Sequence, residues 1–131
     1  MAKAQAVQPS NVPTGGSRPY SLGVRHGNLL YVAGQVGQDF ATGKAVSDTD
    51  FSAQVRQAME NLKSILEAGG SSMDKVLTVN CYITDIARWA EMNEIYNRYF
   101  TSDPKPARAT VQAGLVPPHM FEIQAIAYTD E

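Results

Sequence analysis

The sequence is poor in the residues that mark several classes of protein. It has a single cysteine, Cys81, so no disulfide can form within the chain. Its two histidines, His26 and His119, lie far apart, which excludes a zinc site of the usual spacing. Apolar runs reach only about five residues, as at 29–33, too short for a membrane-spanning helix or a signal-peptide core. These absences predict a protein of a reducing compartment, and we expect the cytoplasm.

Neither sign of charge dominates the sequence. Eleven Lys and Arg residues stand against 13 Asp and Glu residues, which gives a net charge of −2. We therefore expect no nucleic-acid partner, since such proteins usually carry a basic patch, and no membrane partner. Charged residues make up 18% of the chain, below the roughly 25% of an average domain, which suggests that a partner covers part of the surface. The length of 131 residues predicts one domain over 1–131, with an irregular lead-in at 1–18.

The spacing of apolar residues predicts an α+β fold. Apolar side chains from Phe51 to Leu66 recur at helical spacing, and Gly69-Gly70 ends this first helix. A second helix follows Asp85, which can cap it, and ends before Pro104. Segments of strand-forming or alternating residues predict strands at 20–24, 29–33 (ended by Gly34), 76–84, 107–113 and 121–129.

Two helices can cover only one face of such a sheet. Alternation in strand 76–84 predicts that Leu77 and Cys81 face the helices, whereas Val76 and Tyr82 lie on the other face. That second face mixes apolar and polar residues, and exposing it to water would be costly. We therefore expect oligomerisation, for example a closed ring of identical chains.

Two features that imitate reactive motifs fail on spacing or position. Gly37 and Gly43-Lys44 resemble a phosphate-binding loop, but five residues separate the glycines instead of four, and Ala45 replaces the required hydroxyl residue. Cys81 falls on the apolar face of a strand, where a buried thiol is expected to be an inert packing residue.

One unusual pair of residues remains near the C-terminus. Arg108 stands among small residues on a predicted strand, and its planar fork of donors suits a carboxylate. Glu122 is a single carboxylate in an otherwise apolar strand and points away from its apolar face. Spacing alone leaves three alternatives open: the two side chains form a ligand site, they pair with each other, or they protrude into solvent.

A set of short motifs runs in register along nearly the whole chain. They are Tyr20-Ser21, Ala33-Gly34-Gln35, Gln54-x-x-Gln57-Ala58, Asn61-Leu62, Ala68-Gly69, Thr84-Asp85, Asn93, Tyr96, Pro106-Ala107-Arg108-Ala109 and Glu122-Ile123-x-Ala125-Ile126-Ala127. In these motifs the sequence resembles the RidA (YjgF-type) reactive-intermediate deaminases. The resemblance implies a chorismate-mutase-like α+β fold and a homotrimer, in which the sheets form a central barrel and clefts lie between subunits. It also implies hydrolysis of 2-enamino and 2-imino acids, such as 2-aminoacrylate, to 2-keto acids and ammonia, without a cofactor or metal.

The resemblance assigns roles to individual residues. Arg108 and Glu122 are the expected catalytic residues: the first clamps the substrate carboxylate, and the second positions or activates water. The expected substrate-binding residues are Tyr20, Ala33, Gly34, Asn93, Ala109 and Thr110, with Trp89 close to the cleft or packed in the core. Ala33 stands where many members have serine, which removes one hydroxyl contact. His119, in the less typical loop 115–120, is expected to be an exposed loop residue.

Other functions stay open at this stage. The same chemistry would serve a specialised catabolic enamine, of aminomuconate or pyrimidine type, with Ala33 and the loop 116–120 reshaping the pocket. A trimeric protein that binds small carboxylates or regulates a partner without turnover is a second class. Endoribonuclease activity has been attributed to some family members, but the net charge of −2 disfavours it here. Chorismate mutase activity is an analogy of fold alone.

Overall fold

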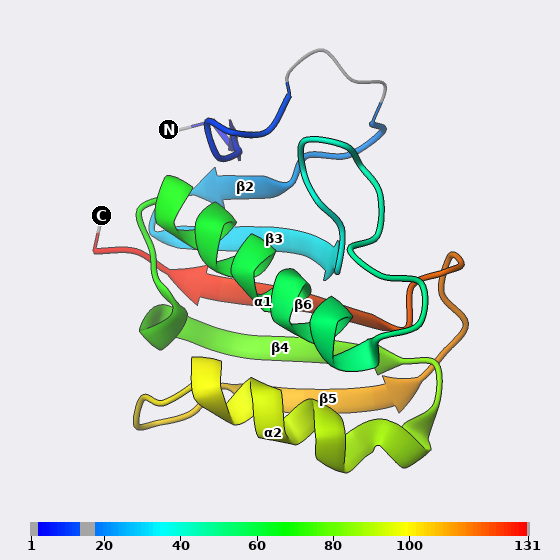
Figure 1. The fold of residues 1–131 in the computed structure, drawn as a ribbon. Coiled ribbons are helices and arrows are strands. Elements are labelled where there is room, and N and C mark those ends of the chain that lie inside the picture. Colours follow the sequence, from blue (N-terminus) through cyan, green and yellow to red (C-terminus); the bar gives the residue numbers. More distant parts are fainter. Residues whose placement is uncertain (1–2, 14–17, 131) are drawn as a thin grey trace.

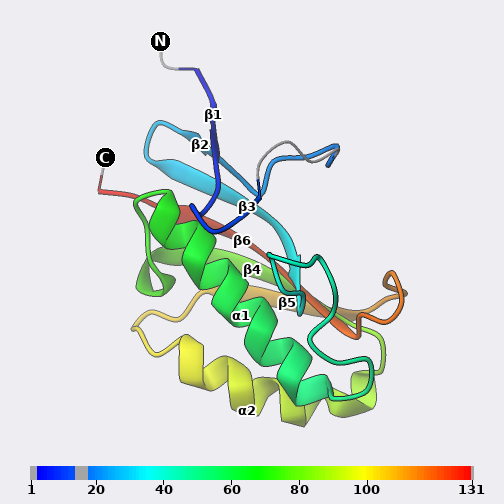
Figure 2. The ribbon, with the colours of Figure 1, turned by 45° about the horizontal axis from the view of Figure 1, so that its top comes forward.

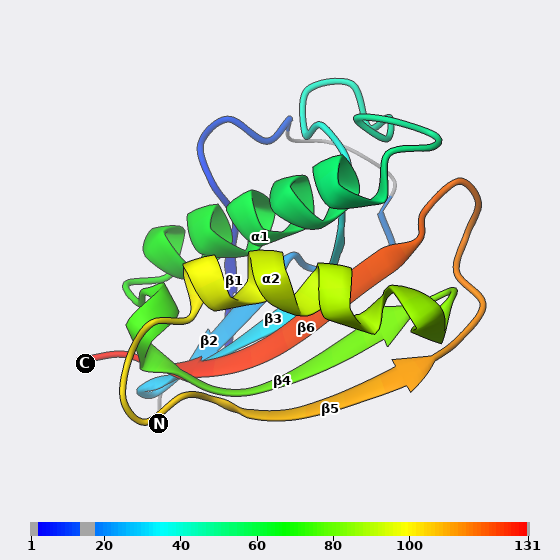
Figure 3. The same ribbon diagram turned by 60° about the horizontal axis from the view of Figure 1, so that its bottom comes forward.

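The computed structural model describes residues 3–13 and 18–130, which form one mixed sheet with two helices on one of its faces (Figures 1 and 3). This arrangement confirms the predicted α+β fold. In chain order the elements are β1 (Gln5–Val7), β2 (Gly23–His26), β3 (Leu29–Val36), α1 (Phe51–Ala68), η1 (Met73–Lys75), β4 (Val76–Ile83), η2 (Ile86–Arg88), α2 (Trp89–Tyr99), β5 (Ala107–Gln112) and β6 (Phe121–Tyr128).

The strand order in the sheet is β1-β2-β3-β6-β4-β5. All neighbouring strands are antiparallel except β4 and β5, which are parallel. A parallel pair needs a crossover connection, and α2 supplies it on the same face of the sheet as α1 (Figure 2). The last strand in the sequence, β6, therefore lies at the centre of the sheet and presents its residues to both faces.

Helix α1 forms where its sequence predicts it. The Asp50 side chain caps it by accepting a hydrogen bond from the Ala53 backbone N–H at 3.0 Å. Its apolar stripe is buried against the sheet. Gly70, just past its end, has φ of +83°, a conformation that glycine adopts without strain.

Two strands depart from the regular alternation that the sequence predicts. Strand β3 does not end at Gly34 but continues to Val36, with an irregular register between Val32 and Gln35. Glycine and an unpaired residue are typical of such a bulge. The irregularity carries the strand past Gly34, so the predicted end at that glycine is wrong.

Strand β4 contains a second irregularity, between Val76 and Thr78. It reverses the faces to which the first side chains of the strand point. Val76 is therefore buried and Leu77 is 48% exposed, the opposite of the prediction. From Val79 onward the alternation is the predicted one, with Cys81 fully buried. The bulge shifts the pleat by one residue and therefore changes the face of every side chain before it.

The N-terminal elements differ in detail from those expected. Strand β2 begins at Gly23 rather than at residue 20, and Gly27 takes the positive φ of +63° at the following turn. Within the segment predicted as an irregular lead-in, Gln5–Val7 forms the short strand β1 and pairs with β2. Residues 1, 2 and 14–17 of that lead-in lie outside the described residues.

The face of the sheet opposite the helices carries exposed aromatic and aliphatic side chains. Tyr31 and Val111 are each 46% exposed and Tyr128 is 38% exposed. Such a face favours association, although the predicted homotrimer stays a prediction. Within the described part of the chain, no helix combines the length and apolar character needed to cross a membrane. The expected cytoplasmic location also stays a prediction.

Candidate functional site

Arg108 lies on the helix-covered face of the sheet. On β5 it stands opposite Val79, a core residue of β4, so its side chain extends toward α2. Its Nη1 donates a hydrogen bond to Oδ1 of Asn93 at 2.7 Å. Its Cζ lies 4.6 Å from the ring centroid of Tyr96 and 6.0 Å from that of Trp89. These contacts hold the guanidinium by one amide and two aromatic rings.

The Arg108 pocket follows from the spacing of α2. Trp89, Asn93 and Tyr96 stand at positions i, i+4 and i+7, which places them on one face of the helix. They line an open cavity of about 290 Å³ beside the arginine. Its lining residues are Trp89, Asn93, Tyr96, Asn97, Lys105, Pro106 and Arg108. Trp89 is 48% exposed, so it belongs to this pocket and not to the core.

The electrostatics of the Arg108 pocket favour an anion. Among the described residues, no acidic side chain forms a salt bridge with Arg108. Burial raises the pKa of Tyr96 to about 12, and it raises the pKa of the neighbouring Cys81 thiol to about 12. Both groups are therefore neutral near pH 7, and the positive charge of Arg108 is uncompensated. Its remaining N–H donors suit a carboxylate.

Glu122 lies on the opposite, open face of the sheet. It stands on β6 opposite Tyr82 of β4 and Val36 of β3, and no hydrogen bond or salt bridge involves its carboxylate among the described residues. A cavity of about 210 Å³ adjoins it, which we call the Glu122 pocket. The lining residues are Tyr20, Gly34, Val36, Gln38, Leu115, Val116, His119 and Glu122.

Gly34 makes room for the Glu122 side chain. A Cβ atom at position 34 would lie 2.8 Å from Cδ and 3.1 Å from Cγ of Glu122, and closer still to Oε2. Contacts of a Cβ atom below 3.0 Å essentially never occur in proteins, so any other residue at position 34 would displace the carboxyl group. The same bulge that prolongs β3 thus brings this glycine against the carboxylate.

The loop before β6 is fixed from the helix side. Gln54 of α1, fully buried, donates through Nε2 to the Pro118 carbonyl at 3.0 Å and accepts at Oε1 from the Met120 N–H at 2.8 Å. His119 stands between these two anchored residues. It is half-buried, and its Nδ1 is buried without a hydrogen-bond partner among the described residues. The expectation of an exposed loop histidine is therefore wrong, because Gln54 ties this loop to the core.

The expected site residues fall into two groups and a remainder. Arg108 and Asn93 meet in one pocket, and Tyr20, Gly34 and Glu122 meet in the other. Ala33 and Ala109 line neither of the two pockets. Thr110 lies on the helix-covered face beside Cys81, and its buried Oγ1 has no hydrogen-bond partner within residues 3–13 and 18–130. Because Arg108 and Glu122 lie on opposite faces of one sheet, the two side chains do not pair within one chain.

Sequence reasoning assigned no site role to Tyr96, Lys105 or His119. The signal for Tyr96 is its i+3 position relative to Asn93 on an amphipathic helix, which predicts a shared face. Lys105 precedes the Pro-Ala-Arg motif, and its Nζ donates to the Phe100 carbonyl at 2.9 Å. The position of His119 depends on the tertiary contact with Gln54, which no local pattern contains.

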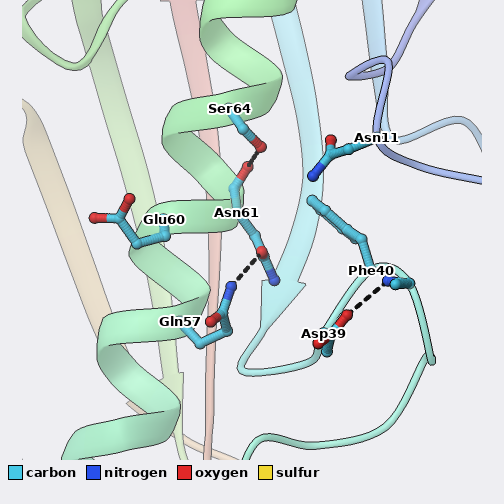
Figure 4. A pocket seen from close by; sticks show the side chains of 8 residues that line it. Asn11, Asp39, Phe40, Gln57, Glu60, Asn61 and Ser64 are labelled. Carbon is cyan, nitrogen blue, oxygen red and sulfur yellow. Dashed lines mark hydrogen bonds between the residues drawn. The ribbon is translucent and has the colours of Figure 1, made fainter.

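A third cavity, of about 410 Å³, lies between α1, the loop after β3 and the N-terminal segment at Asn11 (Figure 4). The buried Asn61 donates through Nδ2 to the Val36 carbonyl at 3.1 Å and the Gln38 carbonyl at 2.8 Å, and it accepts from Gln57 at 2.9 Å. Asp39 likewise accepts from the Ala41 N–H. These polar groups are used in holding the loop after β3, so the cavity is less suited to a ligand than the other two.

Over residues 3–13 and 18–130, no group of three or more acidic, histidine or cysteine side chains is placed to hold a metal ion.

Comparison with known proteins places the chain among relatives of the same length. Residues 13–129 match the model of a family described as Endoribonuclease L-PSP. A RutC family protein of Pyrococcus horikoshii is 43% identical over 113 residues, which cover 86% of this chain and 88% of that protein. The structure of RidA from an Antarctic Psychrobacter has a TM-score of 0.84 at 37% identity and covers 95% of this chain and 98% of its own. Escherichia coli TdcF with bound serine has a TM-score of 0.84 at 30% identity, with 96% and 99% covered.

Proposed function

Because the chain belongs to the Endoribonuclease L-PSP family, which is the YjgF/RidA family, we propose that it hydrolyses 2-imino and 2-enamino acids to 2-keto acids and ammonia. The observation that carries the proposal is the uncompensated guanidinium of Arg108, held by Asn93 and Tyr96 beside an open cavity. A 2-imino acid offers this group a carboxylate next to an electrophilic carbon. The serine bound to the related TdcF is also a small molecule with a carboxylate.

We propose that the complete site forms between two copies of the chain in a homotrimer. Arg108 and Glu122 lie on opposite faces of one sheet, so one chain supplies two separate parts of a site. In a ring of three copies, the Arg108 pocket of one subunit can face the Glu122 pocket of the next. The exposed apolar side chains of the open face, such as Tyr31 and Val111, support such an association.

The proposed reaction needs orientation and one proton acceptor. Arg108 binds the carboxylate through two parallel N–H donors, and Asn93 keeps its guanidinium in place. Glu122 accepts a proton from water while the water oxygen bonds to the imine carbon, and the C=N π electrons move to nitrogen, which takes up a proton. The nitrogen of the resulting carbinolamine takes up the proton held by Glu122, the C–N bond breaks, ammonia leaves, and the hydroxyl returns its proton to Glu122 to give the keto acid. An enamine first takes a proton at carbon and becomes the imine.

The test is to generate 2-aminoacrylate in situ and to follow the loss of its imine absorbance. We expect wild type to accelerate clearance, and Arg108→Ala to slow it at least about a hundredfold, because two charge-assisted hydrogen bonds are lost. Arg98→Ala is the matched control, since this arginine lies on the outside of α2, exposed, and pairs with Glu94. Equal clearance by wild type and Arg108→Ala would refute the deaminase.

A binding measurement with 2-keto acids and a panel of enamine substrates separate the alternative functions. A trimeric carboxylate-binding protein would bind 2-keto acids in an Arg108-dependent manner without turnover. A specialised deaminase would show turnover only with larger enamines in a substrate panel. Ribonuclease activity, which the family description names, is disfavoured by the net charge of −2, because phosphate binding needs several cationic side chains on one surface.

A further inference from the structure

A second polar group that the proposed reaction leaves unused lines the Glu122 pocket. His119 borders the same cavity as Glu122, Gly34 and Tyr20. We propose that His119 determines substrate specificity by donating its Nε2–H to an uncharged oxygen on the side chain of a bound 2-imino or 2-keto acid. The inference rests on the proposed function for the identity of the bound acid. The preferred substrates are therefore 2-imino acids with a hydroxyl or carbonyl group in the side chain.

The surroundings of the imidazole ring select its tautomer. Nδ1 is buried and has no hydrogen-bond partner among residues 3–13 and 18–130, so a proton there would be a buried donor without an acceptor. A buried donor without an acceptor is unfavourable, which favours the tautomer that carries its proton on Nε2. Nε2 is not among the buried unpartnered atoms, so it is the ring nitrogen that can donate to a ligand. His119 thus acts on the ligand as a hydrogen-bond donor.

The other walls of the pocket restrict what His119 can bind. Glu122 carries no compensating cation in the described part of the chain, so a second carboxylate on the substrate would meet like charge. Val36, Leu115 and Val116 contribute apolar surface that favours a short carbon chain. A single donor in such a setting discriminates well between ligands with and without a hydroxyl. An apolar analogue leaves the donor without a hydrogen-bond partner, which weakens its binding.

His119 is also held firmly enough to discriminate. Gln54 bonds the residues on both sides of it, Pro118 and Met120, and the His119 N–H donates to the Val116 carbonyl at 3.0 Å. The backbone that carries the ring is therefore held in place by a buried side chain of α1 before any ligand binds.

The experiment compares two stable keto acids of equal size. 3-Hydroxypyruvate and 2-oxobutanoate differ only in a hydroxyl against a methyl group, and their dissociation constants can be measured by titration calorimetry. We expect His119→Leu to lower the preference for 3-hydroxypyruvate over 2-oxobutanoate by about tenfold relative to wild type, the loss of one hydrogen bond. His119→Gln, which keeps an N–H donor, should recover part of the preference. His26→Leu removes the other histidine, outside both pockets, and should leave the ratio unchanged.

Two outcomes separate this inference from the proposed function. An unchanged ratio in folded His119→Leu and His119→Gln overturns the role of His119, even if wild type clears 2-aminoacrylate in an Arg108-dependent manner. A ratio that depends on His119 in a protein without turnover supports the role of His119 and refutes only the deaminase. A purely structural role for His119 would change both dissociation constants equally and would also overturn the inference.

Discussion

The Arg108 pocket and the Glu122 pocket differ in how their charged groups are held. Arg108 is bonded to Asn93 and packed against Tyr96 on the helix-covered face. Glu122 has no hydrogen-bond partner in the described residues and adjoins a loop on the open face. The first arrangement suits an anchor, whose geometry must exist before the ligand arrives. The second suits a group that exchanges protons, whose lone pairs must stay available.

The difference has a simple origin in the sheet. Arg108 and Glu122 sit at positions of opposite parity, so the pleat sends one side chain under the helices and the other away from them. No change of rotamer can bring them together within a chain. If both act on one substrate, as we propose, the second face must come from another copy.

The largest effect is expected from mixing two inactive variants. Arg108→Ala and Glu122→Gln should each lose at least about a hundredfold in imine clearance, because each removes one part of every site. After unfolding and refolding together in equal amounts, about one quarter of all sites in randomly mixed trimers should hold both intact residues. We expect about that fraction of wild-type activity to return.

The controls are each variant unfolded and refolded alone, which should stay inactive. Mixed samples that are trimeric by light scattering but recover nothing would show that Arg108 and Glu122 do not act across a subunit boundary.

A second test uses two glycines of similar crowding but different neighbours. In Gly34→Ala the new Cβ meets the flexible end of Glu122, so we expect activity to fall about tenfold or more with little loss of stability. In Gly37→Ala the new Cβ would lie 2.5 Å from the backbone Cα and O of Gln54, which cannot yield locally. Gly37→Ala should therefore lower the melting temperature in calorimetry, whereas Gly34→Ala should not. A large loss of stability in Gly34→Ala would show that this glycine is needed for packing.

Asn93→Ala tests whether the anchor is preorganised. Removing the hydrogen bond at 2.7 Å frees the guanidinium, and a hydrogen bond to a charged group contributes about 1.5–3 kcal/mol, so KM should rise about tenfold or more. The rate constant kcat should change little, since Glu122 is untouched. Steady-state kinetics measure both, and Glu94→Ala, on the exposed side of α2, is the control. An effect confined to kcat would contradict the role of Asn93 as an orienting group.

The smallest expected effect is a change of stability with pH, which comes from Cys81 and Tyr96, the two neighbours of Arg108 whose pKa is raised. Burial raises the pKa of Cys81 from 9.0 to about 12 and that of Tyr96 from 10.0 to about 12. The folded state holds these protons more tightly than the unfolded state, so their stabilising contribution is complete below pH 9 and decreases as the pH rises toward 12. Denaturant titrations should show this decrease, and a thiol reagent should modify Cys81 at pH 8 only after unfolding. Rapid modification of the native protein would contradict the burial.

Much of this architecture could be predicted from local sequence. The apolar stripe from Phe51 to Leu66, with Asp50 at its start, specifies α1 because its spacing matches the helix period. The alternation in Phe121–Tyr128 specifies which side of β6 carries Glu122. The family motifs likewise pointed to Arg108, Asn93 and Glu122.

The bulges could not be predicted in the same way. A bulge depends on how two strands meet, so the exposed Leu77 and the passage of β3 through Gly34 follow from pairing with β6. The half-buried His119 likewise depends on Gln54, which lies more than sixty residues away in the chain.

Local sequence was enough to predict the helix α1, the alternation of the strands and the buried Cys81, because these depend on neighbours within a few positions. The folded sheet was needed to show that Arg108 and Glu122 lie on opposite faces, and that Gly34 and His119 border the same pocket as Glu122. Those relations depend on strand register and on contacts between distant segments, which the pleat and the core impose together.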